Sequence, residues 1–215
     1  DLADAEYMIT KVKHGTRRKT PAPPFITSTL QQEASRKLGF QSRRTMKVAQ
    51  ELYEGVDIEG MGATGLITYM RTDSLRISDV AKEEAAQYIL NRFGEKFLPA
   101  KPRVFKTKSN AQDGHEAIRP SMPSLSPEDV KASLTSDQFK LYNLIWNRFM
   151  ASQMSDCIQK TTQAEISAKE YIFKASGYYV DFEGFTTLYV ESKDTEEEKR
   201  VELHAHTNMS EMSGV

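Results

Sequence analysis

The chain has 215 residues, of which 39% are hydrophobic and 27% charged, and its formal net charge is −1. This length and composition exclude an intrinsically disordered protein and allow one large domain or two small ones. Its apolar runs fall well short of the ~20 residues of a membrane span, so no membrane partner is expected.

The near-zero net charge conceals a basic first part and an acidic last part. Between Lys11 and Lys47, ten Lys and Arg residues accompany a single acid, whereas six acids accompany three bases between Glu191 and Glu202. Charges are screened over ~8–10 Å, so the two parts can act separately. The single cysteine, Cys157, cannot form an internal disulfide, and no Cys/His spacing is typical of a zinc site, which favours a reducing, cytoplasmic setting.

A strand-like segment, residues 7–13, opens the chain and leads into a basic stretch. Prolines within residues 21–24 then exclude a helix interior, because proline lacks the N–H that a helix needs. Apolar periodicity and terminal signals predict helices from there on. We expect them over residues 27–38 (with Thr27 or Ser28 as N-cap), 42–53, 78–93 and 136–153, with another helix start at Ser126-Pro127.

The last third of the chain is rich in β-branched and aromatic residues, which predicts β-structure. Strands are expected over residues 161–168, 171–176, 178–182 and 186–190, with turns at Gly177 and Gly184. The opening strand needs partners of this kind, because a lone strand leaves its hydrogen bonds open. We therefore predict an α+β fold in which a mainly helical domain, residues 29–155, is inserted in a discontinuous antiparallel β domain, residues 1–28 plus 156–203. Residues 204–215 are expected to form a disordered tail.

The strongest chemical signal is the sequence GLITYMRTDS, residues 65–74. In an extended chain successive side chains alternate, so Tyr69 and Arg71 would share a face. A tyrosine hydroxyl, with an ordinary pKa near ~10, is a poor nucleophile at neutral pH, but a nearby guanidinium favours the phenolate and suits phosphate oxygens. The glycines before the tyrosine would let a nucleic-acid backbone come close. Spacing alone favours a plainer interpretation, a half-buried strand tyrosine beside a surface arginine.

This decapeptide is similar, nearly letter for letter, to the active-site tyrosine motif of bacterial type IA DNA topoisomerases. Other stretches resemble the family in the same order, over about residues 5–203. They are residues 21–25 (PAPPF), 27–34 (TSTLQQEA), 37–40 (KLGF), 49–55 (AQELYEG), 112–120 (QDGHEAIRP), 141–142, 144–146 and 151–154 (ASQM). The family usually has Ala where Gly114 stands, a departure that leaves the polar groups of that stretch unchanged.

The resemblance implies that Tyr69 attacks a phosphodiester of single-stranded DNA and forms a 5′-phosphotyrosyl bond without ATP. Arg71 would hold the scissile phosphate and stabilise the charge that develops on it. His115 and Arg119, four residues apart, would share one face of a helical turn and form a second DNA-contacting pair. Without the resemblance, His115 would fit a loop residue that caps a neighbouring helix.

Three more residues lie beside the tyrosine, and we expect DNA contacts for Thr68, Thr72 and Asp73 as well. From the residues alone, Thr72 or Asp73 could orient Arg71, or simply cap the turn that follows it. The basic stretch from Lys11 to Lys19 could likewise follow a DNA backbone or protect an exposed strand edge.

The family's metal-binding pattern, an Asp-x-Asp with a preceding Glu and a Lys, is absent from this sequence. By resemblance Mg²⁺ belongs to the full enzyme, and no cofactor or metal ligand is expected in this chain. We interpret the chain, which begins without Met, as a central fragment that does not relax supercoiled DNA by itself. The implied partners are single-stranded segments of negatively supercoiled DNA and the missing domains of the same enzyme, a monomer of the bacterial cytoplasm and nucleoid whose ring opens for strand passage.

Three other function classes remain open, one of which, a pure interaction or scaffold module, would not bind single-stranded DNA. In a DNA-binding module without chemistry, Tyr69 would be structural, and covalent trapping on DNA would separate the two. Tyrosine recombinases also form phosphotyrosine, but through a 3′ linkage and with several dispersed arginines, so the polarity of a trapped adduct discriminates.

Overall fold

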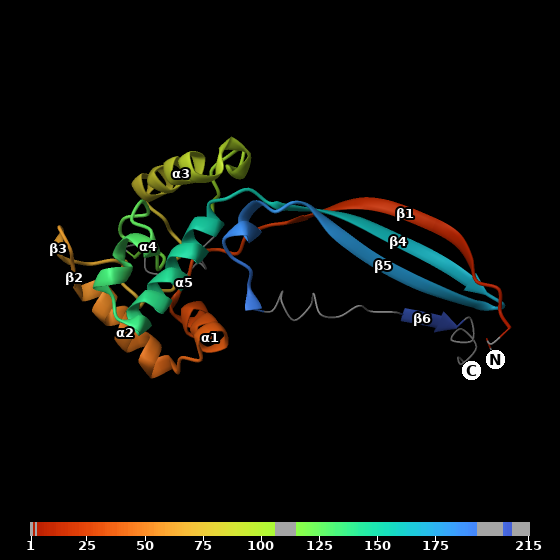
Figure 1. The fold of residues 1–215 in the computed structure, drawn as a ribbon, viewed down its shortest axis with the longest axis horizontal. Coiled ribbons are helices and arrows are strands. Elements are labelled where there is room, and N and C mark those ends of the chain that lie inside the picture. Colours follow the sequence, from red (N-terminus) through yellow and green to blue (C-terminus); the bar gives the residue numbers. More distant parts are fainter. Residues whose placement is uncertain (1, 3, 106–114, 193–203, 208–215) are drawn as a thin grey trace. The chain divides into compact units, whose positions relative to one another are not determined.

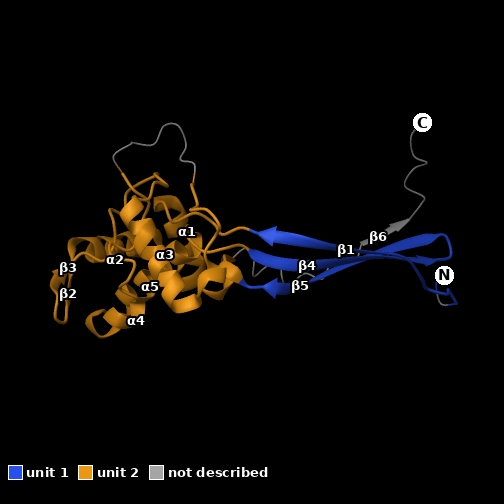
Figure 2. Cartoon of the chain, turned by 90° about the horizontal axis from the view of Figure 1, so that it is seen from above, with its two compact units in different colours: residues 1–19, 157–183, 193–215 blue, residues 20–156, 184–192 orange. Residues whose placement is uncertain are grey.

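The computed structural model describes residues 2, 4–105, 115–192 and 204–207. The chain divides into two compact units, coloured separately in Figure 2. Unit 1 comprises residues 1–19, 157–183 and 193–215, and unit 2 comprises residues 20–156 and 184–192. Unit 1 is built on a β-sheet and unit 2 is mainly helical, so the fold is α+β, as predicted.

The sheet of unit 1 is antiparallel, with the strand order β1-β4-β5-β6; β1, β4 and β5 run side by side in Figure 1. The strands are β1 (Met8–Lys19), β4 (Cys157–Ala168), β5 (Tyr171–Phe182) and β6 (His204–Thr207). A tight turn joins β4 to β5, and its Lys169 adopts a left-handed φ of 53°. Strand β6 lies where a disordered tail was expected, whereas residues 208–215 lie outside the described chain.

One predicted turn and one predicted strand are wrong. Gly177 lies inside β5, paired with Thr162, so the strand continues through it. Residues 186–190 form no strand, because the chain turns into the 3-10 helix η3 (Gly184–Thr187). That turn is possible because Gly184 adopts a left-handed φ of 53°.

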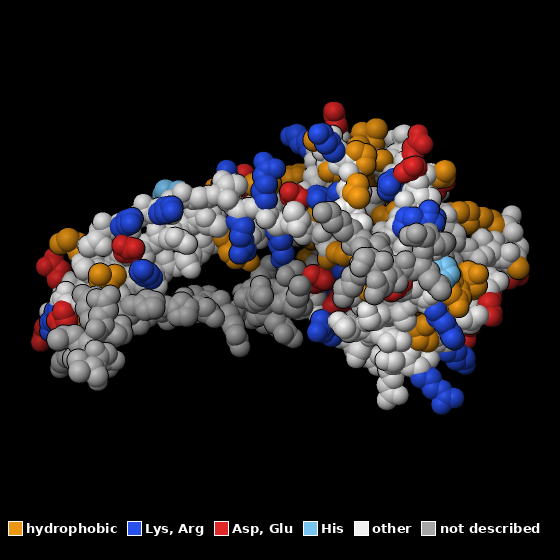
Figure 3. Space-filling model, turned by 180° about the vertical axis from the view of Figure 1, so that it is seen from behind, with side chains coloured by type: hydrophobic (Ala, Val, Ile, Leu, Met, Phe, Trp, Pro, Cys, Tyr) orange, Lys and Arg blue, Asp and Glu red, His pale blue; other side chains and the backbone are white. Residues whose placement is uncertain are grey.

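The basic stretch of the sequence forms β1, an edge strand with almost every side chain exposed. Lys and Arg side chains gather along the sheet in the space-filling view (Figure 3). Arg17 is tied to the sheet: its Nε donates to Gln159 Oε1 (2.7 Å), and its guanidinium lies 5.0 Å from the centre of the Tyr178 ring. Charge on an edge strand discourages pairing with other chains, and it also attracts phosphate, so this position fits both interpretations of the stretch.

Unit 2 contains the helices of the fold, drawn as coiled ribbons in Figure 1. They are α1 (Thr27–Leu38), α2 (Ser42–Glu54), α3 (Asp79–Phe93), α4 (Pro127–Val130) and α5 (Ser136–Ser152), with 3-10 turns η1 (Glu95–Phe97) and η2 (Lys131–Ser133). Strands β2 (Val56–Ile58) and β3 (Gly62–Thr64) form a small hairpin. The predicted helices are confirmed, with ends shifted by at most one residue. None of the helices in the described residues has the length and apolarity to cross a bilayer.

Helix α5 carries much of the core of unit 2, and its buried aromatic side chains satisfy their polar groups. The Tyr142 hydroxyl donates to the Leu125 carbonyl (2.7 Å), and the Trp146 indole N–H donates to the Pro123 carbonyl (3.0 Å). Burial raises the pKa of the Tyr142 phenol above its ordinary value, and the negative charge of Asp129 raises it further. Both aromatic side chains belong to the buried core of unit 2.

The buried guanidinium of Arg148, on α5, binds side chains of the segment that follows β5. The Arg148 guanidinium, almost fully buried, donates to Glu191 Oε1 (2.9 Å) and lies 5.2 Å from the centre of the Tyr189 ring. The Tyr189 hydroxyl in turn donates to Glu33 Oε2 on α1 (2.7 Å). Burial raises the pKa of Tyr189, and this rise exceeds the opposing effect of Arg148. The network joins residues 184–192 to α1 and α5.

Candidate active site

Tyr69 lies on an extended loop, residues 65–77, between β3 and α3, and two other segments hold this loop by its backbone. On one side, the Leu66 N–H donates to the carbonyl of Leu52 near the end of α2 (2.8 Å). On the other side, an isolated β-bridge pairs the loop with the extended segment 115–121. The position of the tyrosine backbone is therefore fixed by main-chain hydrogen bonds, although the loop is not a regular strand.

Burial alternates along the loop from residue 69 to residue 74. The exposed residues are Tyr69, Arg71 and Asp73, and the buried ones are Met70, Thr72 and Ser74. Such alternation is the geometry of an extended chain, so the first three side chains project to the solvent side. The Tyr69 side chain is 39% exposed, which leaves its ring open to a macromolecular substrate.

The Tyr69 ring has two ring neighbours from different segments. The Tyr53 ring, from the last turn of α2, meets it edge to face, with ring centres 5.4 Å apart and an interplanar angle of 64°. The His115 ring is tilted against it at 5.7 Å. Contacts of this kind favour one orientation of an aromatic side chain over the others.

A pocket of about 390 Å³ opens beside these residues. It is lined by Ile26, Thr27, Ser28, Arg71, Thr72, Asp73 and His115. Among the described residues, the side chains of Arg71, Asp73 and His115 have no hydrogen bond or ion pair and are available to a ligand. The pocket includes the start of α1, whose first turn holds no acid, so the helix dipole adds partial positive charge to that of Arg71.

Thr27 joins the start of α1 to the tyrosine loop. Its hydroxyl donates to the Met70 carbonyl (2.8 Å) and accepts the Thr72 N–H (2.9 Å), so it does not cap its own helix. The N-cap is Ile26, which corrects the predicted choice of Thr27 or Ser28. Thr72 Oγ1 accepts the N–H of the residue two positions later (3.0 Å), so Thr72 caps the turn after Arg71, one of the roles considered for it from the sequence.

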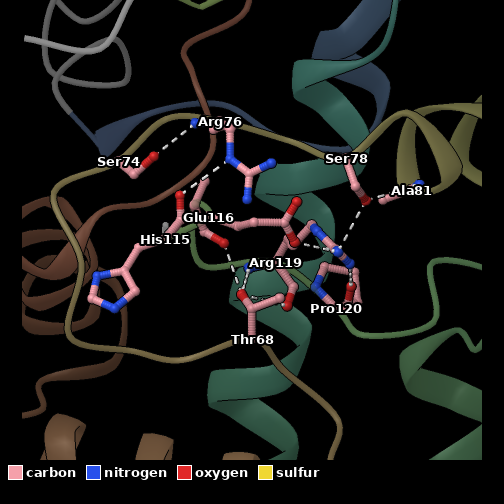
Figure 4. Close-up of polar contacts among 10 residues, drawn as sticks. Thr68, Ser74, Arg76, Ser78, Ala81, His115, Glu116, Arg119 and Pro120 are labelled. Carbon is pink, nitrogen blue, oxygen red and sulfur yellow. Dashed lines mark hydrogen bonds and ion pairs between the residues drawn. The ribbon is translucent and has the colours of Figure 1, made fainter. Parts of the chain in front are cut away.

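The predicted helical turn, which was to place His115 and Arg119 side by side, is wrong. Their segment is extended, because its backbone N–H groups pair with other segments rather than with residues four positions earlier. Arg119 is buried, and its guanidinium donates to Glu116 Oε2 (2.6 Å), Ser78 Oγ (3.3 Å) and the Pro120 carbonyl (2.8 Å). Figure 4 shows the His115 ring pointing away from this cluster.

Thr68 completes the support beneath the tyrosine. Its hydroxyl donates to the Ala117 carbonyl (2.7 Å) and accepts the Arg119 N–H (3.0 Å). Figure 4 shows Thr68 next to Arg119. The side chains of Thr68, Thr72 and Arg119 thus bond to the protein. Those of Tyr69, Arg71 and Asp73 are exposed, and His115 is half-buried.

The sequence did not predict that Tyr53 lies beside Tyr69. It also predicted that the glycines before Tyr69, Gly65 among them, admit a nucleic-acid backbone. A Cβ on Gly65 would lie 2.7 Å from the Tyr53 carbonyl oxygen, so this glycine admits the protein's own backbone. The two tyrosines are 16 residues apart, a separation at which neither helical nor strand periodicity relates two side chains. The AQELYEG stretch that contains Tyr53 was the available signal.

Two comparisons with known proteins bear on this site. A family model described as DNA topoisomerase matches residues 1–213. The solved structure of full-length topoisomerase I from Thermotoga maritima superposes with a TM-score of 0.77 and 39% sequence identity, over 96% of this chain. The chain spans 33% of the length of that protein.

Proposed function

Because the chain belongs to the DNA topoisomerase family, we propose that it supplies the nucleophile with which a bacterial type IA topoisomerase cuts single-stranded DNA. Tyr69 is that nucleophile. The observation that supports this assignment best is the alternation along its loop, which leaves the tyrosine ring and the Arg71 guanidinium exposed on the same side of a backbone fixed by hydrogen bonds.

The reaction is a transesterification. Tyr69 Oη forms a bond to phosphorus as the bond from phosphorus to the 3′ oxygen breaks; the phenol loses its proton and the departing 3′ oxygen gains one. The phosphotyrosyl ester keeps the energy of the broken bond, so the 3′-hydroxyl can attack it and reseal the strand without ATP. Arg71 donates to the non-bridging oxygens, where its planar fork matches phosphate and offsets the developing charge.

The other predicted site residues fall into two groups, according to whether their side chains line the pocket or bond to protein groups. His115 and Asp73 line the open pocket, and we assign them contacts to the DNA beside the scissile phosphate. Thr68, Thr72 and Arg119 are engaged by protein groups, so we assign them to holding the loop in place for the reaction.

The family implies Mg²⁺, but the described residues do not fit a metal site. No group of three or more His, Cys, Asp or Glu in the described part of the chain is arranged to hold a metal ion. We therefore assign the metal ligands and the groups that move protons to the parts of the enzyme outside this chain. Strand passage and relaxation of negative supercoils then need those parts as well.

Replacing Tyr69 by phenylalanine tests the proposal. The full-length enzyme that carries this chain is incubated with a labelled single-stranded oligonucleotide and denatured, and the covalent adduct is measured. Tyr69→Phe should abolish the adduct while oligonucleotide affinity stays within about twofold, because only the attacking oxygen is removed. Tyr179→Phe, on an exposed strand of unit 1, is the matched control and should form wild-type amounts.

Three results of this experiment would refute the proposal. An undiminished adduct in the Tyr69→Phe enzyme would show that another residue is the nucleophile. Binding of the oligonucleotide with no adduct in the wild-type enzyme would favour the alternative, a DNA-binding module without chemistry. An adduct linked through the 3′ phosphate would instead indicate recombinase-type chemistry.

A further inference from the structure

We propose that Tyr53 is a positioning residue for Tyr69, and that Gly65 is the position that lets it act. The inference rests on the proposed function, since it concerns the orientation of the tyrosine that attacks the phosphodiester. Tyr53 itself touches no reacting atom: it holds the Tyr69 ring against one side and so restricts the directions from which the phenolic oxygen can approach phosphorus.

The first step of the argument is that Tyr53 stands on a rigid base. It occupies the last turn of α2, whose Val48, Ala49 and Leu52 are buried in unit 2. Directly after this turn the chain makes the β2–β3 hairpin and returns. The backbone of the tyrosine loop then bonds to the end of α2, with the Leu66 N–H on the Leu52 carbonyl at 2.8 Å.

The second step concerns how closely the loop approaches α2. An added Cβ on Gly65 would lie 2.7 Å from the Tyr53 carbonyl oxygen, closer than real Cβ contacts come. The atom in the way belongs to the backbone and cannot rotate aside. Glycine at this position therefore sets the distance between the loop and α2, and with it the distance between the Tyr53 and Tyr69 rings.

The third step is what the ring contact does. Tyr69 is on a loop and is 39% exposed, so its side chain has less packing around it than a core tyrosine. The edge-to-face contact with Tyr53 at 5.4 Å removes part of its freedom, and the His115 ring at 5.7 Å removes more. Holding a nucleophile near its line of attack lowers the entropic part of the barrier, and misplacement by ~1 Å can cost ~10²-fold in rate.

Tyr53 is itself 40% exposed, so stacking on a DNA base is the competing role. The two roles differ in what they change. A positioning residue alters the cleavage rate of bound DNA, whereas a stacking residue alters DNA affinity, by ~1–3 kcal/mol for each stacked base.

The experiment uses the full-length enzyme under single-turnover conditions with a labelled single-stranded oligonucleotide. The rate of covalent adduct formation at saturating DNA and the Kd for the oligonucleotide are measured separately. Tyr53→Ala should lower the rate about tenfold or more, with a Kd within about twofold of wild type. Tyr53→Phe keeps the ring and should restore the wild-type rate, and Gly65→Ala should lower the rate as Tyr53→Ala does. Tyr179→Ala removes a more exposed tyrosine (63%, against 40% for Tyr53) that has no ring neighbour in the described residues, and it should change neither quantity.

Three outcomes overturn the inference. A wild-type cleavage rate in Tyr53→Ala removes the positioning role, and a weakened Kd with an unchanged rate replaces it by base stacking. Failure of Tyr53→Phe to restore the rate would assign the effect to the hydroxyl. If Gly65→Ala does not fold, the Tyr53→Ala and Tyr53→Phe pair decides alone. If the wild-type enzyme forms no adduct, the proposed function fails. If the wild-type enzyme forms the adduct and Tyr53→Ala forms it at the same rate, the proposed function stands and only the positioning role fails.

Discussion

At the scale of single residues, two arginines near the same tyrosine have opposite surroundings. Arg71 is exposed and has no hydrogen bond or ion pair within the described residues. Arg119 is buried and donates to Glu116, Ser78 and a carbonyl. A guanidinium that is buried and bonded to protein groups helps the fold, whereas an exposed one can bind an incoming phosphate. Substituting the two arginines should therefore separate stability from chemistry.

Arg119→Ala is expected to lower the free energy of unfolding by about 3 kcal/mol, because it leaves the largely buried Glu116 carboxylate without its partner. Arg71→Ala removes an exposed side chain that has no hydrogen bond or ion pair to the described residues, and it should change the same quantity by less than about 0.5 kcal/mol. Urea denaturation of the two variants measures both values. Equal urea midpoints for the two variants would contradict the structural role given to Arg119.

At the scale of secondary-structure elements, the sequence predicted the helices well because their signals are local. The Ser126-Pro127 start, the glycine after α1 and the apolar faces all act within a few residues. The alternation that placed Tyr69 and Arg71 on one side is equally local. The features that were predicted wrongly or not at all depend on contacts between distant parts of the sequence. Tyr53 contacts Tyr69 across a hairpin, and the segment of His115 is extended because its backbone bonds to distant segments.

The glycines also show how far sequence-based prediction reaches, because the residue type alone does not reveal which structural requirement a glycine meets. Gly177 and Gly184 were both predicted as turns, yet a Cβ on Gly177 would meet nothing, since the strand simply continues. A Cβ on Gly184 would lie 2.3 Å from the Asp156 carbonyl oxygen, and its φ is left-handed. The close packing of η3 on residues 155–156, a tertiary contact, makes the second glycine necessary.

Gly184→Ala should therefore destabilise unit 2 by more than the backbone strain alone, which is roughly 1–2 kcal/mol for a left-handed residue. Gly39→Ala provides the control in the same unit: its φ is also left-handed, at 67°, but a Cβ there meets nothing. Thermal unfolding of both variants gives the comparison, and the excess loss in Gly184→Ala measures the clash. If Gly39→Ala loses as much, close packing at Gly184 is not the cause.

At the scale of the whole molecule, each unit is assembled from separated stretches of chain. We propose that this reflects the insertion of the helical part in the β part, as the sequence analysis expected. In unit 2 the second stretch, residues 184–192, is not a passive connection. It contributes Tyr189 and Glu191 to the buried guanidinium of Arg148, so residues 20–156 alone would keep the charge and lose two of its neighbours.

This arrangement predicts that unit 2 can be excised, but only with both stretches. The Phe185 N–H donates to the Ser155 carbonyl at 3.0 Å, so the two ends left by removing residues 157–183 lie side by side and a short Gly-Ser linker can join them. The joined protein should unfold cooperatively in urea. Residues 20–156 alone should be less stable by about 3 kcal/mol or more, because the buried Arg148 charge loses its carboxylate. Equal urea midpoints for the two proteins would mean that the second stretch only follows the fold, and that the Arg148 network does not hold unit 2 together.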